Sequence, residues 1–218
     1  MKKIAILALS VSVLFAACSK KSNNVQPTDP NQITINGTSY STVKIGTQTW
    51  TSLNYNGAGG VNYGNVTGNL VGSGKLYTYA EATAVQLPSG WRLPTKDDVN
   101  KLLSYIGGTK NTDGNYEATG AIAGHLVQQE WPYAYGDDSM GFHAYGFGYY
   151  NSVGSGSFEA KDQMTAFWTS SPVPAPNDTF KYGFDISDIP ENNVRTLDAF
   201  LDLWRPADRL SLRFVKDN

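Results

Sequence analysis

The amino-acid sequence predicts an α+β domain in which short antiparallel strands alternate with two helices and long irregular loops. Three observations support this fold class. Short β-favouring segments begin near Gln32, two helix caps follow at Thr78 and Thr95, and glycine and aromatic residues are abundant after Gly108. Residues 33–218 are numerous enough to enclose a core, so we expect them to form one domain.

Residues 1–17 have the layout of an export signal, with Lys2 and Lys3 followed by a short apolar segment. That segment is shorter than the roughly 20 apolar residues that a membrane-spanning helix needs. It ends in Leu-Phe-Ala-Ala-Cys, which resembles a lipoprotein signal-peptidase site with Cys18 as the lipidated residue. We therefore expect an outer-membrane lipoprotein of the cell envelope, facing either the periplasm or the surface. The alternative is an ordinary secretory signal that is cleaved near Ala17 and leaves a free thiol.

Residues 18–32 contain one aliphatic side chain and two prolines, a composition typical of a flexible tether. Without residues 1–17 the chain carries 15 basic and 19 acidic side chains. This acidic balance argues against nucleic acid as a partner. Cys18 is the only cysteine, so an internal disulfide is excluded and packing must stabilise the domain.

The first predicted strands follow the tether. Two β-favouring segments, Ile33–Ile35 and Tyr40–Ile45, flank the pair Asn36-Gly37. Asn-Gly between such segments is a strong hairpin signal, because both residues tolerate the positive φ of a type I′ turn. A second turn at Gly46 leads to a third segment, Gln48–Leu53.

Two helices are predicted from their caps. Thr78 and Glu81 form a T-x-x-E capping box at the start of a helix over residues 79–86. Thr95 and Asp98 repeat this arrangement, and the apolar stripe of the second helix ends at Gly107-Gly108. The stripe consists of Val99, Leu102, Leu103 and Ile106.

The region after Gly108 is predicted to hold strands separated by long loops. The strand-like segments are residues 142–150, 166–169, 181–186 and 210–215, and residues 196–203 are predicted to form a helix. Long loops in a compact domain often carry function. We therefore expect a binding surface between Gly108 and Pro190.

Five strings are best considered together and in order: TVKIGTQTWTSLNY (42–55), GKLYTYAEATA (74–84), LPSGWRLPTKDDVNKLLSYIGG (87–108), FWTSS (167–171) and LSLRFVKD (210–217). In this order they resemble the Fibrobacter succinogenes major paralogous domain, a family of exported bacterial proteins related to the C-type-lectin-like fold. The resemblance implies two helices packed on antiparallel strands, with long irregular loops presenting the variable surface. It does not imply a settled activity.

The most specific part of the resemblance is the string Gly-Trp-Arg-Leu-Pro-Thr, which contains Trp91, Arg92, Pro94 and Thr95. Pro94 favours an extended residue before it, and Thr95 then begins a helix, so we interpret the motif as a structural corner. Family members often carry two cysteines where this chain has Leu87 and Phe214. We therefore expect these two side chains to lie close together in the core.

Residues for catalysis are scarce. Formylglycine-generating enzymes of the lectin-like fold depend on active-site cysteines, which residues 19–218 lack. A Ser/His/Asp hydrolase needs a histidine beside an exposed serine, but the chain has only His125 and His143 and no G-x-S-x-G motif. Two isolated histidines also give no zinc-binding pattern. We therefore expect a protein that is not an enzyme and needs no cofactor.

The candidate ligand-binding residues are Trp131, Tyr133, Tyr135, Asp137 and Asp138, within a segment rich in aromatic residues. Tyrosine and tryptophan suit sugar faces or a protein partner. The alternative is that the aromatic cluster, which continues through residues 142–150, is part of the core. The two aspartates supply oxygen ligands that calcium would accept.

These observations predict a lipid-anchored envelope protein whose domain binds a glycan or an envelope protein without catalysis. One alternative is a carbohydrate-active enzyme with paired carboxylates, drawn from Glu117, Glu130, Asp137, Asp138 or Glu159. Another alternative is a structural or adhesive assembly subunit. The membrane, reached through lipid on Cys18, is the one partner that the leader predicts.

Overall fold

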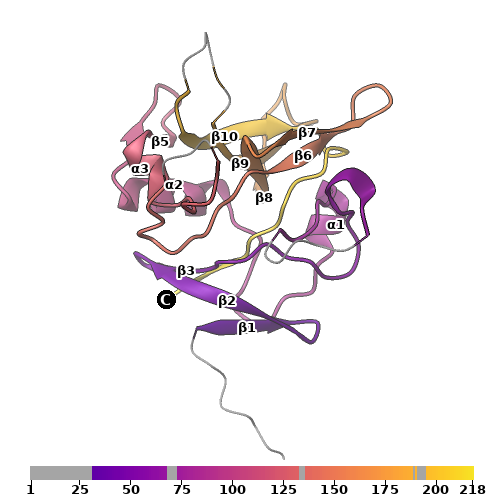
Figure 1. The fold of residues 1–218 in the computed structure, drawn as a ribbon, viewed down its shortest axis with the longest axis horizontal. Helices are drawn as coiled ribbons and strands as arrows, with labels where there is room; N and C mark the ends of the chain where they lie inside the picture. Colours follow the sequence, from indigo (N-terminus) through magenta and orange to yellow (C-terminus); the bar gives the residue numbers. More distant parts are fainter. Residues whose placement is uncertain (1–30, 68–72, 133–135, 189, 191–194) are drawn as a thin grey trace, which may run out of the picture.

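A computed structural model describes residues 31–67, 73–132, 136–188, 190 and 195–218. Two curled sheets form the body of the domain, one of four strands in the order β1-β2-β3-β11 and one of seven in the order β4-β5-β10-β9-β8-β6-β7. In Figure 1 the four-stranded sheet lies below the seven-stranded sheet, with α2 and α3 on one side and α1 on the other. The strands are β1 (Gln32–Ile35), β2 (Thr38–Ile45), β3 (Gln48–Thr51), β4 (Thr109–Lys110), β5 (Tyr116–Thr119), β6 (Phe147–Asn151), β7 (Ser157–Lys161), β8 (Met164–Pro172), β9 (Lys181–Ser187), β10 (Asp198–Trp204) and β11 (Val215–Asp217).

The four-stranded sheet confirms the predicted hairpins. β1 pairs antiparallel with β2 across Asn36 and Gly37, whose φ angles of 50° and 83° are those of a type I′ turn. β2 then turns back into β3 at Gly46. β11, near the end of the chain, adds antiparallel to β3, so the two ends of the domain share one sheet.

Both predicted helices are present with complete capping boxes. In α1 (Tyr79–Thr83) Thr78 and Glu81 cap each other, and in α2 (Lys96–Tyr105) Thr95 and Asp98 do the same. The predicted apolar stripe of α2 is buried. Two shorter helical segments, α3 (Ala121–Gly124) and the 3₁₀ turn η1 (Tyr63–Asn65), complete the described helices.

The predicted α+β, C-type-lectin-like fold class is wrong. The described residues form a β-rich fold of two curled sheets, in which the three α-helices have five, ten and four residues. The physical reason lies after Gly108, where much of the chain predicted to be loop pairs into strands. Glycine and aromatic residues there pack between neighbouring strands, which is a tertiary effect that local patterns do not report.

The clearest local error concerns residues 196–203, which were predicted to be helical. They lie mostly in β10, all seven residues of which pair with β9, while its first two also pair with β5. Pairing with β9 along the whole strand, and with β5 at its first two residues, satisfies backbone groups of β10 and overrides the helix propensity of its leucines and alanine. The predicted strand over residues 142–150 is shorter than expected, since β6 begins at Phe147.

Two hydrophobic clusters fill the domain. The first lies between α2 and the seven-stranded sheet and includes Val99, Leu103, Phe142 and Phe184. The second contains Phe214, with the partly buried Leu87 packed against the same cluster. Leu87 and Phe214 therefore contribute to one cluster.

Arg213 is a buried cation beside aromatic rings of the first cluster. Its residue is 1 % exposed, and the guanidinium stacks on the rings of Phe142 and Phe167, with centroid distances of 4.9 and 5.5 Å. Burial lowers the pKa of Arg213 to about 9, although the negative charge of Asp138 opposes this shift.

Four acceptors receive hydrogen bonds from the guanidinium of Arg213. Its Nε donates to the Asn54 side chain at 2.6 Å, and Nη1 donates to the backbone carbonyls of Thr51 and Phe142 at 2.8 and 2.9 Å. Its Nη2 donates to the carbonyl of His143 at 3.2 Å. One side chain therefore joins the end of β3 to the segment that precedes β6.

Replacing Arg213 with methionine should lower the free energy of unfolding by about 3 kcal/mol or more. Methionine fills similar space but leaves buried acceptors unsatisfied, at a cost of about 1–3 kcal/mol each, partly offset by not burying a charge. Urea unfolding followed by tryptophan fluorescence measures the change. Arg205→Met is the control, because Arg205 is exposed and its loss should cost about 0.5 kcal/mol or less. A cost below about 1 kcal/mol for Arg213→Met would contradict this assignment.

Candidate functional site

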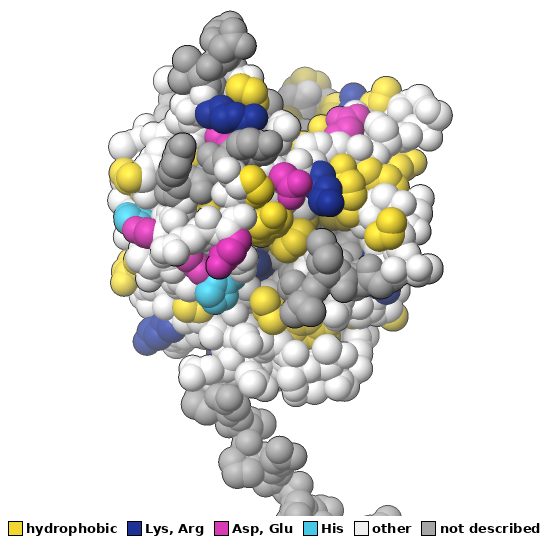
Figure 2. Space-filling view, viewed as in Figure 1, with side chains coloured by type: hydrophobic (Ala, Val, Ile, Leu, Met, Phe, Trp, Pro, Cys, Tyr) yellow, Lys and Arg dark blue, Asp and Glu magenta, His cyan; other side chains and the backbone are white. Residues whose placement is uncertain are grey.

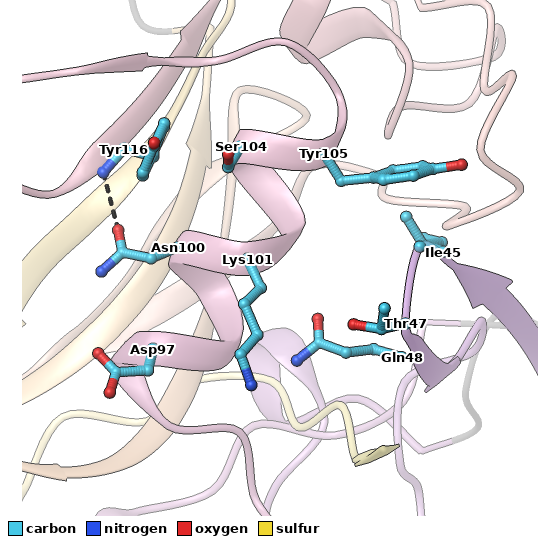
Figure 3. Close-up of a pocket in the computed structure, with 10 residues that line it drawn as sticks. Ile45, Thr47, Gln48, Asp97, Asn100, Lys101, Ser104, Tyr105 and Tyr116 are labelled. Atoms are coloured by element: carbon cyan, nitrogen blue, oxygen red, sulfur yellow. Dashed lines mark hydrogen bonds between the residues drawn. The ribbon is translucent and has the colours of Figure 1, made fainter. Parts of the chain in front are cut away.

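A groove of about 740 Å³ lies beside the exposed face of α2 and the turn between β2 and β3. The sequence positions α2 with its buried stripe inward, which leaves the opposite face of the helix open. Figure 3 shows the side chains that line it. They are Ile45, Gly46, Thr47, Gln48, Asp97, Asn100, Lys101, Ser104, Tyr105 and Tyr116.

Tyr105 is one of two tyrosines that line the groove and is 60 % exposed. Its ring passes directly over Gly46, where a Cβ atom would stand 2.9 Å from the ring carbon Cδ2. Gly46 has φ of +60°, so glycine satisfies both the turn and the close approach of the ring. The turn thus supports one side of an aromatic ring whose remaining surface faces solvent.

Hydrogen bonds fix two of the polar side chains that line the groove, those of Asn100 and Gln48. The Asn100 side chain accepts from the backbone amide of Tyr116 at 2.7 Å (Figure 3). Gln48 donates to Asp98 at 2.8 Å and is buried. These bonds tie the turn and β5 to the helix, while Asp97, Lys101, Ser104 and Thr47 remain exposed for contact with a ligand.

The Gly-Trp-Arg-Leu-Pro-Thr string forms the corner that holds α2 in place. Arg92 donates to both carboxylate oxygens of Asp98, at 3.2 and 2.8 Å, and to Asp217 at 2.9 Å. Burial raises the pKa of Asp98, but the hydrogen bonds from Thr95 and Arg92 outweigh burial and the net shift is downward. Trp91 is half-buried beneath the ammonium group of Lys216. Pro94 is buried just before the helix cap at Thr95.

Of the three aromatic residues predicted to bind a ligand, the structure describes Trp131, and its side chain is buried. Trp131 is 1 % exposed, belongs to the first hydrophobic cluster, and donates its indole N–H to the carbonyl of Asp162 at 2.7 Å. Tyr133 and Tyr135 lie outside the described residues. Further along, Tyr145 and Tyr149 are half-buried and pack on Trp131 and Trp204. Trp131 is therefore a core residue.

Asp137 and Asp138 are each paired with a histidine. His125 Nδ1 lies 3.1 Å from Asp137, and His143 Nδ1 pairs with Asp138. Figure 2 shows each histidine with a carboxylate side chain against it. The backbone amide of Ser139 first, and then His125, lower the pKa of Asp137 to about 2.

These pairs border a polar pocket of about 440 Å³, lined by Gln128, Gln129, Glu130, Asp137, Asp138 and His143. Ser139 Oγ lies 2.9 Å from His125 Nδ1, the same nitrogen that contacts Asp137. A catalytic triad needs its serine and its aspartate on opposite ring nitrogens, so this arrangement is not a triad. In the described part of the chain, no three His, Cys, Asp or Glu side chains gather as a metal site. Calcium binding by the two aspartates stays a prediction.

Of the carboxylates proposed for catalysis, Glu130, Asp137 and Asp138 line this one pocket, whereas the other two lie elsewhere in the fold. Glu117 is on β5, whereas Glu159 is on β7 and accepts a hydrogen bond from the hydroxyl of Tyr149 at 2.8 Å. A carboxyl that the sequence did not single out, Asp185 on β9, has its pKa raised well above the usual value by complete burial. It accepts from the indole of Trp204 at 3.0 Å and is closed off from solvent.

Sequence reasoning missed the groove. Tyr105 could have indicated an exposed aromatic surface, because it lies outside the apolar stripe of α2 and must therefore face outward. Its partner Gly46 is far away in the sequence. The sequence predicts a turn at Gly46 but no contact between this turn and the helix. Local patterns identify each part but do not report that they meet.

A family model, the Fibrobacter succinogenes major domain, matches residues 43–216 of the chain. This range covers the groove, the corner motif and Arg213. A search of curated proteins and a search of solved structures found no match. Among the residues that the structure describes, no helix has the length and apolar character needed to cross a bilayer.

The contact between Gly46 and Tyr105 can be tested with a double-mutant cycle. Gly46→Ala should cost about 1–2 kcal/mol, because it introduces both a positive φ for alanine and a clash with the ring. In a Tyr105→Ala background the clash disappears, so the cost should fall by about 0.5 kcal/mol or more. Chemical unfolding of the four proteins measures both values.

Gly37→Ala is the matched control for this cycle. Gly37 also has a positive φ, of 83°, but a Cβ there would meet nothing within 4 Å. Its cost should be the same in both backgrounds, within about 0.3 kcal/mol. Equal costs of Gly46→Ala in the two backgrounds would show that the ring does not rest on the turn.

Proposed function

We propose that this chain, which belongs to the Fibrobacter succinogenes major domain family, is a lipid-anchored envelope protein that binds glycan without catalysis. The proposed binding site is the groove beside α2. Family membership supports the domain assignment, and the leader supports export. The geometry of the groove supports the ligand class.

The anchor rests on residues outside the described part of the chain. Lys2, Lys3 and the apolar segment that follows precede Cys18, the proposed site of lipidation. β1 begins at Gln32, the last residue of the proposed tether, so the folded domain starts where the tether ends. This arrangement would hold the domain beside the membrane.

One observation carries the choice of ligand: the ring of Tyr105 is exposed yet held in position by Gly46. An aromatic ring that is already fixed loses little conformational entropy when a ligand stacks on it. Sugars offer an apolar ring face for stacking and hydroxyls for hydrogen bonds. The exposed side chains of Thr47, Lys101 and Ser104 supply partners for those hydroxyls.

The groove favours binding over hydrolysis. A glycosidase places two carboxyl groups on either side of the scissile bond, separated by roughly 5–10 Å. Among the described residues that line the groove, Asp97 is the one carboxylate. The proposed role is therefore recognition of a saccharide, with no chemical step assigned to the groove.

Binding of the full chain, in detergent, to a glycan array tests this proposal. Tyr105→Ala should weaken binding of the selected glycan by about tenfold or more, because it removes the stacking surface. Tyr105→Phe should retain most of the affinity, since the ring remains. Val153→Ala, at another exposed apolar position, is the control and should bind like the unaltered protein. Equal binding by Tyr105→Ala, or binding to no glycan on the array, would contradict the proposal.

A further inference from the structure

We infer that the saccharide in the groove is acidic, with a carboxylate that pairs with the ammonium group of Lys101 while its ring stacks on Tyr105. This inference rests on the proposed function and names its ligand class. Uronic acids combine both features in one residue. Three observations about Lys101 carry the inference: its position, its weak pairing and the charge of its neighbours.

Lys101 and Tyr105 are neighbours on one face of α2. A separation of four residues places them about 6 Å apart along the helix axis and on the same side. In Figure 3 the side chain of Lys101 extends beside Gln48, and the ring of Tyr105 extends above Ile45. Both side chains line the groove, so one ligand can contact the ring and the cation together.

The charge of Lys101 is not neutralised by a close carboxylate in the described structure. Its ammonium nitrogen lies 4.0 Å from one oxygen of Asp217, at the outer limit of an ion pair, and its side chain is 56 % exposed. The other oxygen of Asp217 accepts from Arg92 at 2.9 Å. A weakly paired, exposed cation gains more from an incoming anion than one already held in a tight ion pair.

The buried carboxylate of Asp98, at the start of α2, already accepts hydrogen bonds from other side chains. Asp98 receives hydrogen bonds from Arg92, Thr95 and Gln48, so it does not draw Lys101 inward. The exposed carboxylate of Asp97 lies one turn before Lys101 on the helix. It would repel a second acid, so the ligand's carboxylate should reach Lys101 from the side of Gln48, away from Asp97 (Figure 3).

Trigalacturonic acid and its methyl ester form a matched pair of probes. The two trisaccharides have the same sugar rings, but the ester carries no negative charge. Isothermal titration of the full chain in detergent should show at least tenfold tighter binding of the acid at low ionic strength. This preference should shrink as salt is added, because salt screens exposed charges.

Variants at Lys101 test whether this residue causes the preference for the acid over the ester. Lys101→Gln should reduce binding of the acid about tenfold and leave binding of the ester unchanged, whereas Lys101→Arg should keep the preference for the acid. Lys161→Gln, which removes an exposed lysine on β7, is the control and should change neither affinity.

The outcomes separate this inference from the function on which it rests. Equal binding of acid and ester, with no effect of Lys101→Gln, would overturn the acidic ligand and leave glycan binding standing. A preference for the acid that survives Lys101→Gln would also overturn the inference, because the carboxylate would bind elsewhere. If neither probe binds but a neutral glycan from the array does, the inference alone fails. If the array yields no glycan, both fail.

Discussion

The structure depends on the burial of one cation, the guanidinium of Arg213. Burying a charge is costly unless hydrogen bonds satisfy it, and here four oxygen atoms and two aromatic rings surround the group. The acceptors come from the end of β3 and from the segment before β6, which are far apart in the sequence. Arg213 can therefore be satisfied only when these segments and the C-terminal string are all in place.

The position of the groove depends on this arrangement. Just after Arg213 the chain enters β11, which pairs with β3 and brings Asp217 close to Arg92. Arg92 in turn fixes Asp98 at the start of α2, and α2 presents Lys101 and Tyr105 to the β2–β3 turn. The ends of the matched family region, residues 43–216, thus lie on either side of β3 in one sheet.

The sequence predicted those features that depend on neighbouring residues. The Asn36-Gly37 hairpin and both capping boxes are local arrangements of side chain and backbone, and all three were predicted correctly. The fold class and the strand β10 depend on which strands pair, so local patterns misjudged them, whereas the burial of Trp131 agrees with the core alternative for the aromatic cluster. The groove was missed for the same reason, since Gly46 and Tyr105 meet only after folding.

The central claim is that an acidic saccharide binds in the groove beside α2. Its most direct test is a crystal structure of the full chain with trigalacturonic acid bound. The account predicts one sugar ring stacked on Tyr105 and its carboxylate about 3 Å from the ammonium nitrogen of Lys101. An ordered saccharide elsewhere, such as in the polar pocket beside His143, with the α2 groove empty, would contradict it.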